Sequence, residues 1–163
     1  MYEPIPPLIE RAKLEARIAE LGRQITADYA GKNYIRVIGA LRGCFVFMAD
    51  LIRAIEMPVK VDFMEISSYG NATTSSGNIK ILKDLTDDVM GEHVLVAEDI
   101  IDSGLTLQSM IDLLKGRGVA SIEIATLLIK PKNVAAQRKL IYPVKYRAFE
   151  VSDEFVVGAG MDY

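Results

Sequence analysis

HVLVAEDIIDSGLT, residues 93–106, carries the strongest structural signal in this sequence. The apolar run Val94 to Ala97 has the length and the β-branched content of a buried strand. Behind it, a helix is predicted to begin near Leu105 or Thr106, because apolar residues recur at helical spacing in Leu107, Met110, Ile111 and Leu114. Residues 93–106 therefore predict a strand, an acidic turn and the start of a helix.

The turn between this strand and this helix offers two kinds of chemistry. The first helical turn has N–H groups without helical partners and the positive end of the helix dipole, which suits a phosphate. The carboxylates of Glu98, Asp99 and Asp102 suit hydroxyl groups, Mg²⁺ or a proton in transit. A sugar phosphate with a bound metal ion would match both the start of the helix and the carboxylates. The alternative is a solvated acidic loop in which Asp102 or Ser103 caps the helix.

The composition favours one soluble domain over residues 1–163, since half of the residues are hydrophobic and can form one sizeable core. A net charge of −3 gives no general attraction to nucleic acids or anionic membranes. Cys44 is the single cysteine, so no intramolecular disulfide forms, and we assign its side chain to packing. The N-terminus lacks a secretory signal, and no apolar stretch approaches the roughly 18 residues of a membrane span. We expect a cytoplasmic protein.

Strands and helices alternate from Tyr34 onward, which predicts an α/β fold with a central, mostly parallel sheet flanked by helices. The expected helices lie within 8–29, over 45–55 and after 105. The expected strands cover 34–41, 59–66, 79–82, 94–97, 121–129, 144–149 and 155–157. Residues 67–78 are small and polar, which indicates a flexible loop.

Ligands of such folds bind outside the carboxyl ends of the strands, near a topological switch point. Three unusual segments fall at this edge of the predicted sheet. Leu41-Arg42-Gly43-Cys44 follows one strand, the acids follow another, and Lys130-Pro131 follows a third. The fold prediction therefore gathers these segments into one cleft.

EDIIDSGLT resembles the phosphoribosyl pyrophosphate signature of the phosphoribosyltransferases, in the form of the hypoxanthine-guanine members. VDFMEISSYGN, IKILKDLTDDVMGEHVLVAEDIIDSGLTL and EVSDEFVVGAGMDY are similar to successive segments of the bacterial hypoxanthine phosphoribosyltransferases. The resemblance covers nearly the whole chain. It implies the type I phosphoribosyltransferase fold, with a small hood and a flexible catalytic loop. The implied activity is purine salvage: phosphoribosyl pyrophosphate and hypoxanthine, with guanine as a further substrate, give IMP (or GMP) and pyrophosphate.

For the phosphoribosyl donor, the resemblance implies that Glu98 and Asp99 hold the ribose diol, directly or through Mg²⁺. Asp102 is the implied general base. The phosphoribosyl phosphate would be bound by Asp102 together with Ser103, Gly104, Leu105 and Thr106. Arg42 and Gly43 match the loop that touches pyrophosphate, although lysine is commoner at Arg42; from its type alone, Arg42 would be a solvated loop charge.

For the purine, Lys130 is the implied donor to the six-oxo group. An ammonium group only donates, so it selects an oxopurine over adenine, whose amino group also donates. Phe155 would stack on the base and the backbone of Val156 would read its edge, although a Phe in this context is more often a core residue.

Ser68 and Tyr69 match a mobile catalytic loop that excludes water, with a plain flexible connector as the alternative. Asp162 matches an acid that holds a second Mg²⁺.

The sequence departs from the family pattern in two places. It ends at Tyr163, where relatives continue with a segment that carries a pyrophosphate-contacting arginine. Lys130-Pro131-Lys132-Asn133 also lacks an arginine that bacterial relatives often have. Both departures remove positive charge near the leaving group, so we expect weaker binding of pyrophosphate.

The resemblance also implies a homodimer or homotetramer. Three other functions stay open: a xanthine-preferring enzyme, a regulator that senses phosphoribosyl pyrophosphate and binds RNA, and a degenerate structural paralogue. An RNA-binding face would need a basic patch, and no Lys/Arg cluster supplies one. The intact acids and Lys130 argue against the paralogue.

Overall fold

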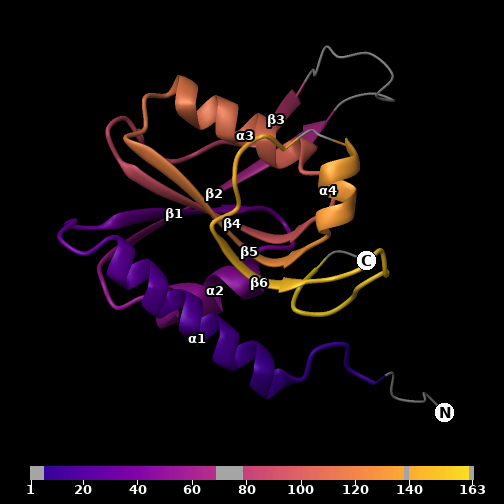
Figure 1. The fold of residues 1–163 in the computed structure, drawn as a ribbon. Helices are drawn as coiled ribbons and strands as arrows, with labels where there is room; N and C mark the ends of the chain where they lie inside the picture. The colour runs from indigo at the N-terminus through magenta and orange to yellow at the C-terminus, as the bar shows by residue number, and fades with distance from the viewer. Residues whose placement is uncertain (1–5, 69–78, 138–139, 162–163) are drawn as a thin grey trace.

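The structure, a computed structural model, describes residues 6–68, 79–137 and 140–161. Its centre is a six-stranded sheet in the order β3-β2-β1-β4-β5-β6 (Figure 1). The strands are β1 (Ile35–Ala40), β2 (Val59–Ser68), β3 (Ile79–Lys83), β4 (His93–Ile101), β5 (Ser121–Ile129) and β6 (Tyr146–Glu150). Strand β3 is antiparallel to β2, and the other neighbouring strands are parallel. The expected α/β class with a mostly parallel sheet is confirmed.

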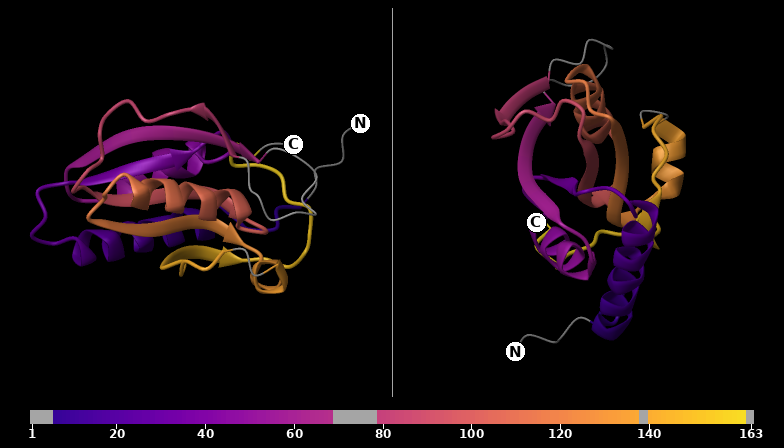
Figure 2. Two further views of the ribbon diagram at one scale, coloured as in Figure 1. Left: turned by 90° about the horizontal axis from the view of Figure 1, so that it is seen from above. Right: turned by 90° about the vertical axis from the view of Figure 1, so that its left-hand side faces the viewer.

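The sheet separates two layers of helices. Helices α1 (Arg11–Asp28) and α2 (Phe45–Ala54) cover one face, and α3 (Leu105–Gly116) covers the other (Figures 1 and 2). Along β4, Leu95 and Ala97 pack with α1 and α2, whereas Val94 and Val96 pack with α3. Both faces of β4 are therefore buried, which explains why its sequence is a continuous apolar run. No helix of the described residues has the length and apolar character that crossing a bilayer requires.

The strand order creates a switch point between β1 and β4. From β1 the chain passes through α2 to β2 on one side, and it later enters β4 on the other side of β1. Because Gly39 pairs with Ala97, the loop that follows β1 lies beside Glu98 and Asp99. The expected binding edge is thus also the place where the connections diverge.

Several element boundaries differ from the sequence prediction. Strand β4 does not end at Ala97 but continues through the acids to Ile101, because Glu98, Ile100 and Ile101 still pair with β5. Strand β6 begins at Tyr146 rather than at Val144. Helix α1 lies within the predicted range 8–29.

The predicted strand over residues 155–157 was wrong, since this segment has no strand structure. Residues Gly158, Ala159 and Gly160 all have positive φ, so the chain bends directly after the short apolar run. Helix α4 (Pro131–Gln137) was not predicted. It is too short for a periodic pattern, although proline at a first helical position favours a helix start.

Candidate functional site

Pairing between strands brings separate segments to the carboxyl edge of the sheet. Ile101 of β4 pairs with Ile129 of β5, and the Lys130 N–H donates to the Ile101 carbonyl at 2.9 Å. The Val151 N–H donates to the Ile129 carbonyl at 2.9 Å. Lys130 therefore lies between the turn that begins at Asp102 and the segment that follows β6.

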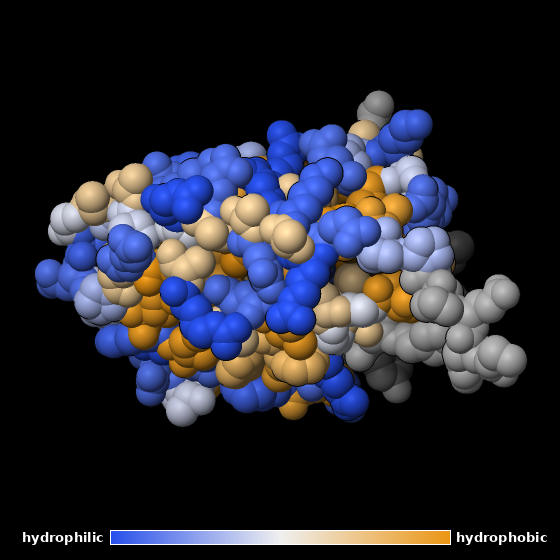
Figure 3. All heavy atoms as spheres, turned by 90° about the horizontal axis from the view of Figure 1, so that it is seen from below, coloured by the Kyte–Doolittle hydropathy of each residue, from blue (hydrophilic) through white to orange (hydrophobic). Residues whose placement is uncertain are grey.

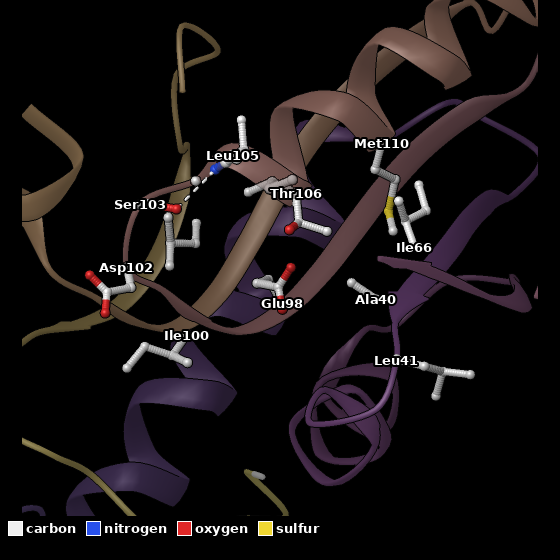
Figure 4. Close-up of a pocket in the computed structure, with 13 residues that line it drawn as sticks. Ala40, Leu41, Ile66, Glu98, Ile100, Asp102, Ser103, Leu105, Thr106 and Met110 are labelled. Carbon is white, nitrogen blue, oxygen red and sulfur yellow. Dashed lines mark hydrogen bonds between the residues drawn. The ribbon is translucent and has the colours of Figure 1, made fainter. Parts of the chain in front are cut away.

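A cavity of about 270 Å³ opens beside the turn between β4 and α3 (Figure 4). Its walls come from the end of β4, the turn, the first turn of α3, and Ala40, Leu41 and Ile66. The Ser103 hydroxyl accepts the Leu105 N–H at 3.3 Å. The amino end of a 12-residue helix thus faces a hollow lined by the hydroxyl-bearing Ser103 and Thr106, an arrangement suited to an anion.

Gly104 allows the turn to bend into α3. Its φ of 74° lies in the left-handed region, which side chains with a Cβ rarely adopt. A Cβ at this position would also come within 2.5 Å of the Leu140 Cβ. The predicted phosphate turn is therefore a conformation that this sequence permits only with glycine.

The neighbouring acids Glu98 and Asp99 have different surroundings. Glu98 lines the cavity (Figure 4), whereas the Asp99 side chain is buried against the loop after β1. A Cβ on Gly43 would lie 1.9 Å from Asp99 Oδ2, so the loop backbone approaches this carboxylate closely. Burial raises the pKa of the Glu98 carboxyl well above its usual value, and the neighbouring Asp99 raises it further. The acids and the Arg42–Gly43 loop form one side of the site.

Arg42 is exposed at the rim of this side. Its Nε lies 3.4 Å from Glu65 Oε1, on β2. The Leu41–Arg42 peptide bond is cis, and the Leu41 N–H donates to the Met64 carbonyl at 2.9 Å. Cys44, two residues after Arg42, is fully buried, and burial together with nearby carboxylates raises the pKa of its thiol to about 12. The thiol is therefore protonated, in agreement with a packing role.

Lys130 and Asp102 meet on the other side of the site. Lys130 is buried, and its Nζ lies 3.6 Å from Asp102 Oδ2 and 3.6 Å from Asp153 Oδ1. Asn133 Nδ2 donates to Asp102 Oδ1 at 2.7 Å and to Asp153 Oδ1 at 3.0 Å. The Asn133 hydrogen bond and the Lys130 charge lower the pKa of Asp153. One ammonium and one amide thus bind the same two carboxylates.

Sequence reasoning did not identify Asn133 or Asp153 as site residues. They lie 31 and 51 positions after Asp102 (133 − 102 and 153 − 102) and approach it only through α4 and the segment after β6. The one available signal was their position: Asn133 closely follows Lys130, and Asp153 closely precedes Phe155.

The remaining predicted residues are less completely defined. The Phe155 side chain is exposed, while Val156 is partly buried and packs against the core beneath α1. The Ser68 backbone ends β2 and pairs with Ile79, but its side chain is outside the description. Tyr69 and Asp162 lie outside the described residues. Within the described ranges, no group of three or more His, Cys, Asp or Glu side chains is placed to hold a metal ion.

Comparisons with known proteins point to one family. A sequence model of the phosphoribosyl transferase domain matches residues 9–163. Hypoxanthine phosphoribosyltransferase of Haemophilus influenzae is 49% identical over 158 residues, which cover 96% of this chain and 86% of the relative.

Solved structures show the same similarity in three dimensions. A hypoxanthine-guanine phosphoribosyltransferase from Bacillus anthracis has a TM-score of 0.89 and 42% identity, with coverage of 99% of this chain and 92% of the other. A hypoxanthine phosphoribosyltransferase from Staphylococcus aureus has a TM-score of 0.88 and 42% identity, with coverage of 97% and 83%. With these coverages, the similarity extends over nearly the whole chain.

Proposed function

This chain belongs to the phosphoribosyl transferase family, and we propose that it acts in purine salvage as a single domain over residues 1–163. In this reaction the 5-phosphoribosyl group of phosphoribosyl pyrophosphate passes to hypoxanthine or guanine. A ring nitrogen of the purine forms a bond to the anomeric carbon of the ribose, and the bond from that carbon to pyrophosphate breaks. The products are IMP or GMP and pyrophosphate.

The 3.6 Å approach of Lys130 Nζ to Asp102 Oδ2 carries this proposal. Hypoxanthine and guanine present the O6 acceptor and the N7 position side by side on one edge of the ring. Lys130 donates to O6, and Asp102 accepts the proton that the five-membered ring carries at N7. A donor-only group beside an acceptor therefore matches a 6-oxopurine, and the adenine amino group would face a second donor.

The cavity beside this pair suits the phosphoribosyl donor. The N–H groups and hydroxyls of residues 103–106 bind the 5′-phosphate at the start of α3. Glu98 and Asp99 hold the ribose hydroxyls. Because the pKa of Glu98 is raised, Asp99 supplies most of the negative charge that stabilises the positive charge developing on the ribose ring. Arg42 and the Gly43 backbone bind the departing pyrophosphate, which the closeness of Gly43 to Asp99 supports.

The donor set on this side fits Mg²⁺. Magnesium is commonly bound by one or two carboxylates together with substrate phosphates and water, so a cluster of three protein ligands is not required. Glu98 faces the cavity and Asp99 is beside it. These two residues would hold one ion with the donor, and Asp162 would hold a second. When bound, Mg²⁺ neutralises charge on the leaving pyrophosphate.

Residues around Lys130 would complete the binding site for the purine base. Asp153 lies 3.6 Å from Lys130 Nζ, so the segment that contains Phe155 and Val156 starts beside the proposed base position. Phe155 stacks on the purine, and the Val156 backbone binds its edge. Ser68 and Tyr69 belong to the loop that excludes water from the ribosyl cation.

Product analysis tests this function. The protein is incubated with phosphoribosyl pyrophosphate and Mg²⁺, and with hypoxanthine, guanine or xanthine in turn. Chromatography should show IMP and GMP as rapidly formed products. An absence of both nucleotides would overturn the proposal, and a dominant xanthine product would change the assigned substrate.

We also propose a homodimer or homotetramer in the cytoplasm. The face of the molecule below α1 and α2 shows apolar side chains among charged ones (Figure 3). Large apolar residues that are exposed in the described structure include Leu8, Phe45, Val61 and Val157, and burial of such residues favours association. Sedimentation of an active sample at micromolar concentration should give a dimer or tetramer, and an active monomer would contradict this assembly.

A further inference from the structure

We propose that Asn133 is a positioning residue that holds the Asp102 carboxylate in place for proton transfer. This inference rests on the proposed function and extends it to a residue on α4. The Asn133 amide donates one hydrogen bond to Asp102 at 2.7 Å and another to Asp153 at 3.0 Å. An ionised carboxylate only accepts, so the amide must present its nitrogen to both acids.

Asp102 needs such a partner because burial does not fix its orientation. About half of its side-chain surface is exposed, at 54%. Its described contacts to side chains are with Asn133 and Lys130. The orientation of the carboxylate therefore depends on polar contacts rather than on packing.

Binding of the purine changes the balance between these two contacts. Lys130 must turn its ammonium group toward O6 of the base, and its attraction to Asp102 and Asp153 is then shared with the ligand. Asn133 makes no proposed contact with the base and can keep its hydrogen bond to Asp102. It then becomes the main side chain that aims the carboxylate at N7.

Backbone hydrogen bonds hold Asn133 in place. Its N–H donates to the Lys130 carbonyl at 3.1 Å, as does the N–H of Val134. The Val134 side chain packs against the core on the α3 side of the sheet. The second hydrogen bond of the Asn133 amide goes to Asp153. Asp153 lies at the start of the segment that contains Phe155 and Val156. Asn133 therefore connects Asp102 with the segment proposed to bind the purine.

A double-mutant cycle tests the role of Asn133. Leucine has nearly the shape of asparagine but no donor, so Asn133→Leu removes both hydrogen bonds. We expect it to lower kcat for hypoxanthine about tenfold, the lower end for loss of a hydrogen bond to a charged group. The KM for phosphoribosyl pyrophosphate should change less than about twofold, because the two hydrogen bonds removed go to Asp102 and Asp153 and not to residues 103–106 of the phosphate turn. In an Asp102→Asn background the same change should lower kcat less than about twofold, since no general base remains there for Asn133 to position.

The controls separate this role from a structural one. Ala135→Leu changes an exposed position of the same helix and should keep the parent kcat. If Asn133→Leu does not fold, Asn133→Ala replaces it in the cycle. Equal losses of kcat with and without Asp102 would overturn the inference while the parent remains active. A parent without nucleotide formation would overturn the proposed function and this inference with it.

Discussion

Lys130 and Asp102 have opposite hydrogen-bonding abilities and come from adjacent strand ends, so their proximity is fixed by sheet pairing. The Lys130 N–H bonds to the carbonyl of Ile101, the residue before Asp102. Any ligand that bridges the two side chains must accept at one atom and donate at the next. This requirement is chemical rather than steric, which is why these two side chains determine the proposed choice of base.

Replacing Asp102 with asparagine should lower kcat by roughly 10²–10⁴-fold, the usual loss when a general acid–base group is removed. Asparagine keeps the size of the side chain and its hydrogen bond from Asn133, so folding and donor binding should persist. Steady-state kinetics with hypoxanthine provide kcat, and thermal unfolding provides the control for folding. A folded variant with the parent kcat would remove Asp102 from the mechanism.

Candidate site residues that a local sequence pattern marks could be predicted, whereas residues that join the candidate site only through tertiary contacts could not. The signature around Glu98 to Thr106 is contiguous, and Lys130 follows a recognisable strand. Asn133 and Asp153 are connected to Asp102 by single hydrogen bonds and ion pairs across long intervals of chain. Neither interval has a motif that specifies the contact.

At the scale of elements, the turn between β4 and α3 connects the fold to its proposed chemistry. Strand β4 reaches further than its apolar run, because the acidic residues still pair with β5. Helix α3 begins at Leu105, in agreement with the predicted start near Leu105 or Thr106, because the apolar spacing behind the start is regular. Helix α4 and the bend at residues 158–160 escaped prediction, because short segments are determined by their neighbours rather than by periodicity.

Gly104→Ala should destabilise this turn by about 1–2 kcal/mol for the left-handed conformation, and further through contact with Leu140. Gly91→Ala is a matched control, because Gly91 has nearly the same φ, 72°, and no atom within 4 Å of the added Cβ. Urea unfolding should show the larger loss for Gly104→Ala. Its KM for phosphoribosyl pyrophosphate should also rise, whereas an unchanged KM would separate the turn from donor binding.

At the scale of the whole molecule, a charged network stabilises the edge of the sheet opposite the site. Arg36 is buried near the start of β1 and forms ion pairs with Glu92 and Asp87. The Tyr34 hydroxyl donates to Glu92 at 2.8 Å. These contacts, mainly the Arg36 hydrogen bonds, lower the pKa of Glu92 from 4.5 to about 2. The network is distant from the carboxyl edge, so it affects stability rather than the proposed chemistry.

The pH dependence of stability follows from this lowered pKa. A carboxyl with a folded-state pKa below its unfolded value contributes stability above the unfolded pKa, here 4.5, and loses it as the pH falls toward 2. Glu92→Gln should lower the free energy of unfolding by about 3 kcal/mol at pH 7, because buried Arg36 loses the more buried of its two charged partners and keeps only exposed Asp87. Urea unfolding at pH 7 and pH 3 should show a smaller difference between parent and variant at pH 3. An equal difference at both values would show that the Glu92 charge does not stabilise the fold.

Lys130 and Asp102 are proposed to select a 6-oxopurine together as the acceptor of the phosphoribosyl group. A competition between hypoxanthine and adenine at equal concentration, with phosphoribosyl pyrophosphate and Mg²⁺, tests it most directly. Adenine presents an amino group to Lys130 and leaves buried donors without partners, so IMP should exceed AMP by at least about a hundredfold. Chromatographic quantification of the two nucleotides at early times gives the ratio. Comparable rates of IMP and AMP formation would contradict the account.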